Sequence, residues 1–263
     1  MNDNTLAPFT IIPNPNRLYL TDSLKAIMQK SRFTINKRQG LSCILGDVGL
    51  GKSTILRYLW GEYSAMDDYK TVMIPTADFS SKYGMVKEIC AEFGIEPMRS
   101  SSSQTRKFQE FLFEQYGAGK NVVLFIDEAQ NLTNQQLEVL RTMLNFENNE
   151  VKTVQIVLAG QIELKAKLDH KKNKYLKSRI VMYSTLNPLT LNEAKAMLEK
   201  RCEDADIKNP FSDEVIEKIY VKSQGVPRSI LKICSYLHEL KTDYDLEDIP
   251  VDYVDTASVE VAL

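Results

Sequence analysis

Short apolar runs alternate with helical patterns over the first two thirds of the chain. Five runs have the length and composition of strands: residues 41–45, 71–74, 122–126, 154–158 and 180–183. The run at 122–126 contains no polar residue, which is typical of a strand buried on both faces in a parallel sheet. Because helical patterns separate the runs, the sequence predicts an α/β fold with a doubly wound, parallel five-stranded sheet.

The pattern changes after Pro188, where no further strand-like run occurs. Three helices are predicted, at about 190–202, 213–223 and 228–240. Their starts are marked by capping or breaking residues: Thr190 with Glu193, Ser212, and Gly225-Val226-Pro227. A small all-helical lid is therefore expected to follow the α/β core.

Both ends of the chain differ from the middle. Residues 6–20 contain three prolines and predict an extended arm, followed by a helix at 21–30. Residues 242–263 carry seven acidic and no basic side chains. They fit a solvated tail or short terminal helix; the alternative is an acidic docking or autoinhibitory segment that competes with a polyanion. The predicted division is an arm and helix (1–30), a core (31–188), a lid (189–241) and an acidic segment (242–263).

Composition excludes several classes of protein. The 33 basic and 35 acidic residues give a net charge of −2, so only local patches could favour nucleic acid. The four cysteines have neither metal-ligand nor disulfide spacing, and we expect reduced, buried thiols. No apolar stretch reaches the length of a membrane span, and the start of the chain lacks the features of a secretory signal. We expect a cytoplasmic protein without membrane contact. The serine run 100–103 is expected to form a loop.

A phosphate-binding motif lies between the first predicted strand and a helical pattern. The eight residues from 46 to 53 satisfy Gly-x-x-x-x-Gly-Lys-[Ser/Thr], the P-loop pattern, and Thr54 follows them. Its glycines let successive backbone N–H groups point at one anion, and the following helix adds the positive end of its dipole. Lys52 would bind the β- and γ-phosphates of ATP, and the Ser53 hydroxyl would bind Mg²⁺. The expected nucleotide-binding residues are Gly46, Asp47, Val48, Gly49, Leu50, Gly51, Lys52, Ser53 and Thr54.

A second motif follows the buried run at 122–126. Asp127 is expected at the carboxyl end of that strand, where open α/β sheets bind ligands. It suits a ligand of Mg²⁺, held directly or through water. Glu128 beside it suits the general base that activates water. The plainer alternative is a surface acidic pair at a strand end.

These motifs together resemble the AAA+ ATPases. Within them the chain is similar to the branch of ExeA/GspA-type ATPases and the transposition regulators TnsC, TniB and MuB. The resemblance covers about residues 6–240. It rests on Pro8-Phe9, Pro13, Leu18-Tyr19, the P-loop, Leu-Phe-Ile-Asp-Glu-Ala-Gln-Asn-Leu at 124–132, Val-Leu-Ala-Gly-Gln at 157–161, and Gly-Val-Pro-Arg at 225–228.

The resemblance implies roles for four more residues. Gln161 matches the sensor-1 residue that orients water or contacts the γ-phosphate, and Arg228 matches the sensor-2 arginine of the lid. Arg179 matches the arginine finger, which would complete the site of a neighbouring subunit in a ring or helical filament. Tyr19 lies in the arm that would cover the adenine. The alternatives are an ordinary loop glutamine at 161 and a surface arginine at 179.

The resemblance also implies a function: an ATPase that oligomerises on duplex DNA without sequence specificity. It would recruit or activate a transposase, with a target-selector protein as a further partner, and disassemble on hydrolysis. An ExeA/GspA-like adaptor for secretion-complex assembly is an alternative, although the membrane span and peptidoglycan-binding domain of those proteins are not found here. An oligomerising signalling or defence ATPase is another.

Two stretches are candidates for DNA contacts. By position in the resemblance, the first supplies Lys82, Arg99, Thr105 and Arg106, which would bind phosphates. The second, residues 165–179, carries six lysines and an arginine against one aspartate, and fits either a DNA surface or a solvated helix. No helix-turn-helix or zinc-finger spacing that could read bases is found.

Overall fold

A computed structural model describes residues 7–147 and 151–261 of the chain. They form two compact units, which are described separately. The sheet unit comprises Asp22–Asp47 and Lys52–Leu186, and the helical unit comprises the described residues 7–21, 48–51 and 187–261. The first residues of the predicted arm and the last two of the acidic segment lie outside the described residues. The four-part division stays a prediction.

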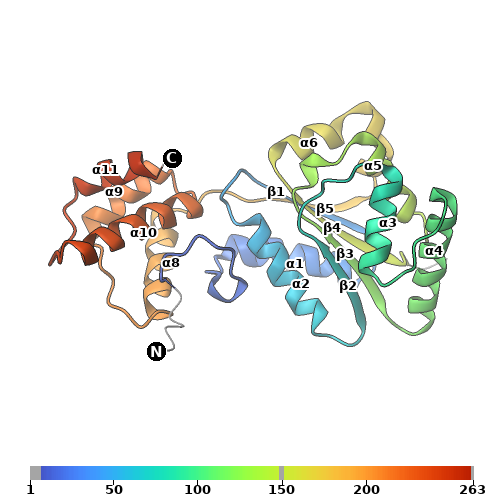
Figure 1. Ribbon diagram of the computed structural model, residues 1–263, viewed down its shortest axis with the longest axis horizontal. Coiled ribbons are helices and arrows are strands. Elements are labelled where there is room, and N and C mark those ends of the chain that lie inside the picture. The colour runs from blue at the N-terminus through green and yellow to red at the C-terminus, as the bar shows by residue number, and fades with distance from the viewer. Residues whose placement is uncertain (1–6, 148–150, 262–263) are drawn as a thin grey trace. The chain divides into compact units, whose positions relative to one another are not determined.

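The sheet unit is built on five parallel strands (Figure 1). They are β1 (Leu41–Leu45), β2 (Tyr69–Ile74), β3 (Asn121–Ile126), β4 (Val154–Gly160) and β5 (Ile180–Thr185). Their order across the sheet is β2-β3-β4-β1-β5. The predicted fold class is therefore confirmed, and each predicted strand forms.

Burial follows the position of each strand in the sheet. Every residue of β1, β3 and β4 is buried, whereas the edge strands β2 and β5 are partly exposed. In the register, Leu45 of β1 lies opposite Gly160 of β4, and Ile126 of β3 lies opposite Leu158 of β4. The carboxyl ends of these three central strands therefore meet at one edge of the sheet.

Helices cover both faces of the sheet (Figure 1). On one face lie α1 (Asp22–Asn36) and α2 (Lys52–Ser64). On the other lie α3 (Lys82–Glu92), α4 (Ser101–Gly117), α5 (Asn134–Met143), α6 (Ile162–Asp169) and α7 (Lys174–Lys177), with the 3₁₀ turns η2 (Ala129–Asn131) and η3 (Lys171–Asn173). A capping box of Thr133 and Gln136 opens α5, and Gln136 Nε2 also donates to the Phe79 carbonyl. This layered packing explains why the central strands lack polar side chains at almost every position.

Two predictions about helices need correction. The serine run 100–103 is not a loop, because Ser100 caps α4 by accepting from the Ser103 N–H at 3.1 Å. Serine hydroxyls that favour turns also satisfy the free N–H groups of a first helical turn, so composition could not separate the two outcomes. The first helix also continues beyond the predicted end at residue 30, as far as Asn36.

The helical unit packs around its own core. Its elements are η1 (Pro15–Arg17), α8 (Leu191–Glu203), α9 (Asp213–Ser223), α10 (Pro227–Asp243) and α11 (Tyr253–Glu260). Phe9 of the arm is 1% exposed. Its ring centroid lies 5.2 Å from that of Phe211 and 5.5 Å from that of His238. The arm is therefore anchored by an aromatic side chain in the helical core. All four cysteines of the chain are buried free thiols, as expected.

The acidic segment contributes α11 to this core. Val254 and Ala257 are fully buried, and Asp255 forms ion pairs with Lys218 and Lys222 of α9, each at 2.7 Å. These two lysines hold the pKa of Asp255 down at about 2. The short terminal helix proposed from sequence thus forms, while the docking role of the acidic segment stays a prediction.

Candidate active site

The ends of three neighbouring strands supply the predicted site residues of the sheet unit. The P-loop follows β1, the acidic pair follows β3, and Gln161 follows β4, which lies between them. The Gly46 N–H donates to the Gly160 carbonyl at 3.2 Å, which fixes the start of the P-loop to the end of β4. Parallel strands bind ligands at their carboxyl ends for this reason: the loops that follow them converge.

Lys52 is the first residue of α2 and is only 5% exposed. Its Nζ donates to the Asp47 carbonyl at 2.8 Å, so the ammonium group folds back over the loop. Gly49 and Gly51 have φ values of +85° and +95°, which L-residues with side chains rarely adopt. The P-loop therefore has the tight turn that its glycine pattern predicts.

The turn Val48–Gly51 makes its contacts within the helical unit. The Arg228 N–H, in the first turn of α10, donates to the Gly49 carbonyl at 3.2 Å. A Cβ atom at Gly49 would lie 2.9 Å from Val226 Cγ1 and 3.1 Å from Arg228 Cβ. Gly49 is thus required both for its backbone conformation and for this close approach. Arg228, whose side chain is exposed, thus lies directly beside the turn Val48–Gly51.

Asp127 and Ser53 lie together in the sheet unit. Asp127 is 3% exposed, and burial raises the pKa of its carboxyl, whereas hydrogen bonds from the Ser53 side chain and the Glu128 N–H lower it. Lys52 also acts on this carboxyl as a favourable charge. One hydroxyl and one carboxylate are a sufficient protein contribution for Mg²⁺, which takes its remaining ligands from phosphate oxygens and water. The pair fits the predicted metal site.

Glu128 has a left-handed backbone, with φ 51° and ψ 36°. This conformation costs a residue with a side chain on the order of 1–2 kcal/mol. Such outliers persist where surrounding contacts enforce them, often at functional sites. The Glu128 N–H donates to Asp127 Oδ1 at 2.9 Å, and Glu128 Oε2 accepts from Gln130 Nε2 at 2.5 Å. The side chain is half-buried and retains a second carboxylate oxygen for other partners.

Gln161 stands at the N-cap of α6 and is half-buried. Its side chain makes no capping hydrogen bond, so it is not committed to its own helix. Its backbone N–H donates to Gln130 Oε1 at 3.0 Å. Gln130 therefore touches both the segment of the predicted base and the segment of the predicted sensor.

Sequence reasoning assigns no catalytic role to Gln130 or Lys167. Gln130 lies within the motif string at 124–132, which was the signal available, but nothing in the string shows that its side chain bridges two strands. Lys167 appeared only as one charge of the basic stretch. Its Nζ in fact donates to the carbonyls of Gln130 and Leu132 at 2.5 and 2.7 Å, so it holds the turn after β3 and is committed within the chain.

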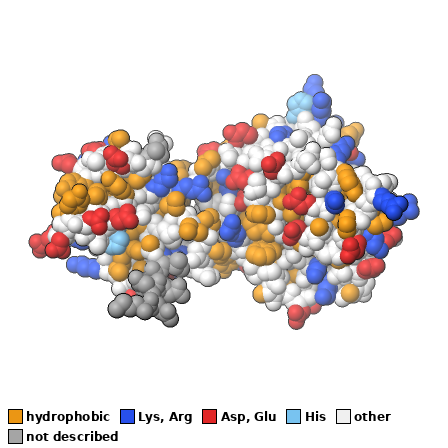
Figure 2. Space-filling view, viewed as in Figure 1, with side chains coloured by type: hydrophobic (Ala, Val, Ile, Leu, Met, Phe, Trp, Pro, Cys, Tyr) orange, Lys and Arg blue, Asp and Glu red, His pale blue; other side chains and the backbone are white. Residues whose placement is uncertain are grey.

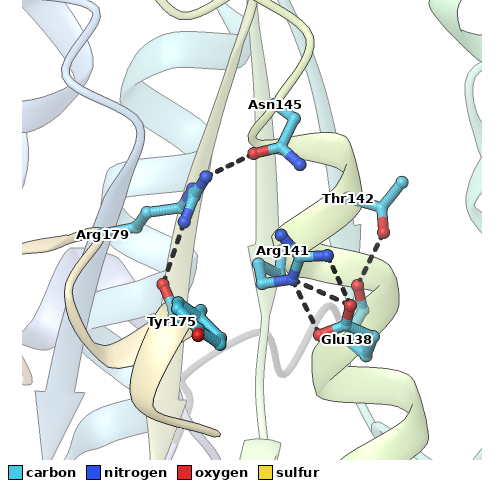
Figure 3. Close-up of polar contacts among 6 residues, drawn as sticks. All are labelled: Glu138, Arg141, Thr142, Asn145, Tyr175 and Arg179. Atoms are coloured by element: carbon cyan, nitrogen blue, oxygen red, sulfur yellow. Dashed lines mark hydrogen bonds and ion pairs between the residues drawn. The ribbon is translucent and has the colours of Figure 1, made fainter.

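Arg179 lies between α7 and the edge strand β5, close to Tyr175 and Asn145 (Figure 3). Its Nη1 donates to the Tyr175 carbonyl at 3.0 Å, and its Nη2 to Asn145 Oδ1 at 2.5 Å. Its Nε is buried and has no hydrogen-bond partner among the described residues. Arg141 lies nearby in Figure 3, bound to Glu138 one helical turn before it on α5. The predicted finger is thus held by contacts within its own chain.

The candidate DNA residues lie on α3, on α4 and before α4. Lys82 begins α3, and Arg99 precedes the α4 cap; both side chains, and that of Arg106, are exposed. Thr105 is less suited to contact a DNA phosphate, because it is half-buried and its hydroxyl donates to the Ser101 carbonyl at 2.9 Å. On the face of the sheet unit shown in Figure 2, Lys and Arg side chains stand out over α4 and beyond α6, with acidic side chains between them.

Tyr19 of the arm is half-buried and packs against the core of the helical unit. None of the helices formed by the described residues is long and apolar enough to span a membrane. Among these residues there is also no group of three His, Cys, Asp or Glu side chains that could hold a metal ion. A metal here would depend on the phosphates of a nucleotide for part of its coordination.

A five-stranded parallel sheet with a P-loop after β1 and a buried aspartate after β3 defines a P-loop nucleotide-hydrolase fold. The chain matches the AAA domain family (AAA_22) over residues 35–168, about half of its length, and it belongs to this family. P-loop proteins of this kind bind ATP with Mg²⁺, and Lys52, Ser53 and Asp127 are the residues that would hold them here.

Two curated proteins are similar in sequence. General secretion pathway protein A of Aeromonas hydrophila is 29% identical over 231 residues, which cover 86% of this chain and 42% of that protein. An uncharacterised HTH-type transcriptional regulator of Methanocaldococcus jannaschii is 29% identical over 136 residues, covering 49% of this chain and 32% of that protein. The chain thus spans less than half the length of these relatives. The first match supports the predicted ExeA/GspA-like branch.

Several solved structures share the fold. ORC2 of Aeropyrum pernix, solved with ADPNP and ADP, has a TM-score of 0.72 at 16% identity, covering 97% of this chain and 71% of that one. Cdc6p of Pyrobaculum aerophilum has a TM-score of 0.71 at 17% identity, covering 99% and 71%. RuvB of Thermotoga maritima, a Holliday junction branch migration motor, has a TM-score of 0.55 at 17% identity, covering 89% and 67%. At these identities the likeness establishes the AAA+ fold; closeness to the transposition regulators stays a prediction.

Proposed function

We propose that the strand-end residues divide the work of ATP hydrolysis. Lys52 and the P-loop amides hold the phosphates, and Ser53 with Asp127 holds Mg²⁺, which neutralises charge on the phosphate oxygens. Glu128 accepts a proton from the attacking water, and Gln161 orients that water or contacts the γ-phosphate. Support comes from the Ser53–Asp127 hydrogen bond and from the half-buried Glu128 carboxylate directly beside it.

Two arginines complete this scheme. Arg228 reports on the nucleotide from the first turn of α10, supported by its backbone contact with Gly49. Tyr19 and the arm cover the adenine. Arg179 acts on the nucleotide of a neighbouring copy, so that ATP bound by one subunit favours a ring or helical filament.

We further propose that the assembly forms on duplex DNA and regulates a transposase, with which a target-selector protein would act. The observation that carries DNA binding is a group of exposed cations on and beside adjacent helices, Lys82, Arg99 and Arg106. None of the three forms an ion pair with another described residue, whereas neighbouring Lys107 is paired with Glu110. Unpaired exposed cations are free to neutralise phosphates, which gives binding that depends on salt but not on sequence. The fold neighbour ORC1 of Aeropyrum pernix was solved in complex with DNA.

A second candidate is an adaptor ATPase that assembles a secretion complex. The specific observation for it is the 29% identity to general secretion pathway protein A over 86% of this chain. Both candidates share the ATPase scheme and differ in what directs assembly. DNA directs it in the first, and a protein partner directs it in the second.

The deciding experiment images the purified chain by negative-stain electron microscopy with a slowly hydrolysed ATP analogue, with and without duplex DNA. Rings or filaments that appear or lengthen on DNA support the DNA-directed regulator. Assemblies that require the nucleotide but ignore DNA favour the adaptor. A chain that stays monomeric under both conditions contradicts the shared-site scheme.

Charge reversal tests the proposed DNA surface directly. Lys82→Glu with Arg106→Glu should weaken duplex binding at least about tenfold and reduce the salt slope by roughly two. Lys87→Glu is the matched control, because Lys87 is exposed on another side of α3 and carries the same charge. Equal losses in both variants would indicate a general charge effect. No loss in the double variant would remove this surface from the proposal.

A further inference from the structure

The side chain of Gln130 bridges the ends of two neighbouring strands. On one side its Nε2 donates to Glu128 Oε2 at 2.5 Å; on the other its Oε1 accepts from the Gln161 N–H at 3.0 Å. We infer that Gln130 is a positioning residue, which aims the Glu128 carboxylate and couples it to the segment of Gln161. This inference rests on the proposed role of Glu128 as general base.

The orientation of the Gln130 amide is dictated by its partners. A backbone N–H can only donate, so the group facing Gln161 must be the amide oxygen. The NH₂ group therefore faces Glu128, and an ionised carboxylate is an acceptor that suits it. No other assignment of oxygen and nitrogen satisfies both partners, so the geometry requires a carboxamide at position 130.

The surroundings of Gln130 are shaped for this bridge. A Cβ atom at Gly160 would lie 3.1 Å from Gln130 Oε1, 3.3 Å from its backbone N and 2.8 Å from Leu164 Cδ2. Glycine at the end of β4 thus leaves the space that the Gln130 side chain uses. Lys167 Nζ donates to the Gln130 carbonyl and so fixes the backbone of η2. Side chain and backbone are held by contacts from β4 and α6.

The bridge has a chemical consequence for Glu128. With Oε2 bound by Gln130, the carboxylate has a defined direction and presents its remaining oxygen to a water molecule. The left-handed backbone at Glu128 sharpens this requirement, because the side chain begins from an unusual direction and needs a second support. A displacement of the Gln161 segment would also pull on Gln130, so the aim of the base responds to what the sensor segment contacts.

The test compares three variants for kcat and for the Kd of ATP. Gln130→Glu keeps an acceptor for the Gln161 N–H but faces Glu128 with a second carboxylate. Its kcat should fall about 10- to 100-fold, since a displaced general base loses much of its contribution, while Kd changes less than about threefold. Asn131→Asp is the matched control: it adds the same charge to the same 3₁₀ turn at an exposed position, and kcat should stay within about twofold. Gln130→Leu removes both hydrogen bonds and should lower kcat at least as much as Gln130→Glu.

A double-mutant cycle separates this inference from the proposed base. In a Glu128→Gln background, Gln130→Leu should cause no further loss, because Gln130 acts through the Glu128 carboxylate. Multiplicative losses, or a Gln130→Glu variant with normal kcat, would overturn the inference while leaving the base in place. Normal hydrolysis by Glu128→Gln alone would instead overturn the base and the inference with it. Melting temperatures with and without ATP identify any variant that fails to fold.

Discussion

Glu128 and Arg179 belong to the same sheet unit, yet the structure holds them in different ways. Glu128 follows the fully buried strand β3, and its carboxylate is bound by a side chain that is itself anchored to the next strand. Arg179 precedes the edge strand β5, and its guanidinium is bound by the Tyr175 carbonyl and the Asn145 carboxamide. The first arrangement fixes a direction inside the subunit. The second holds a long, rotatable side chain through neutral acceptors, which an anionic phosphate can replace.

The largest expected effect comes from Lys52→Ala. This variant tests ATP binding, on which the proposed roles of Glu128 and Arg179 both depend. Loss of the buried ammonium should weaken ATP binding at least about 100-fold and abolish measurable hydrolysis, since a charged hydrogen bond to phosphate disappears. Titration calorimetry with a slowly hydrolysed analogue measures this. Lys52→Arg, which keeps the charge, is the control for electrostatics alone. Unchanged affinity in Lys52→Ala would remove the premise of the site.

Arg179→Ala tests the second arrangement. Hydrolysis should fall on the order of 10³-fold, the lower end for arginine fingers, while a monomer keeps its ATP affinity. Arg141→Ala is the matched control, because Arg141 lies nearby but is paired with Glu138; its activity should stay within about twofold. Loss in Arg141→Ala alone would move the finger to α5.

Mixed assemblies show whether Arg179 acts in trans. Subunits with Arg179→Ala retain the base, and subunits with Glu128→Gln retain the finger. Where the two kinds of subunit meet in a mixed assembly, some of the shared sites contain both an intact base and an intact finger. Activity should reappear on mixing two inactive proteins. Stable mixed assemblies that stay inactive would argue against a site shared between copies.

Glu128→Gln tests the first arrangement on its own. ATP should still bind, and hydrolysis should fall about 10²- to 10³-fold, the usual contribution of a general base. Assemblies formed with ATP should therefore persist for longer than those of the wild type. The check is a single-turnover phosphate-release assay beside an assembly lifetime measured by light scattering. Normal phosphate release would reassign the base.

The comparison also shows what the sequence could and could not predict. The P-loop, Asp127 and Glu128 could be predicted because glycine spacing and an unbroken apolar strand dictate local backbone geometry. The bridge through Gln130 was not, because it joins residues 130 and 161 through a register that only the assembled sheet defines. The prediction of a loop at residues 100–103 was wrong for a related reason. Serine hydroxyls favour both turns and helix starts, and the packing of α4 decides between them.

Gly160→Ala perturbs the first arrangement without removing a polar group. The added methyl group would press on Gln130 and Leu164, so kcat should fall about tenfold as the base loses its aim, with little change in the Kd of ATP. Overpacking should also cost about 1 kcal/mol of unfolding free energy. Gly61→Ala is the control, because nothing lies within 4 Å of a Cβ atom there; it should be neutral or slightly stabilising. Equal kcat in the two variants would show that the space at Gly160 is not needed for catalysis.

The smallest expected effect concerns stability at Asp127. Burial raises the pKa of this carboxyl, so its ionised form is less favourable in the folded chain than in the unfolded one. The sign follows from linkage: the stabilising contribution is present below the unfolded pKa and is lost as pH rises through the folded pKa. Asp127→Asn carries no such penalty, and without nucleotide it should melt at a higher temperature than the wild type at pH 7. Acidification below the ordinary pKa of aspartate should remove that advantage, because the wild-type carboxyl is then neutral too.

A melting-temperature difference that does not depend on pH would show that burial does not destabilise the Asp127 carboxylate. A loss of stabilisation by Mg²⁺ and ATP in the same variant would show that the buried charge is kept for the metal.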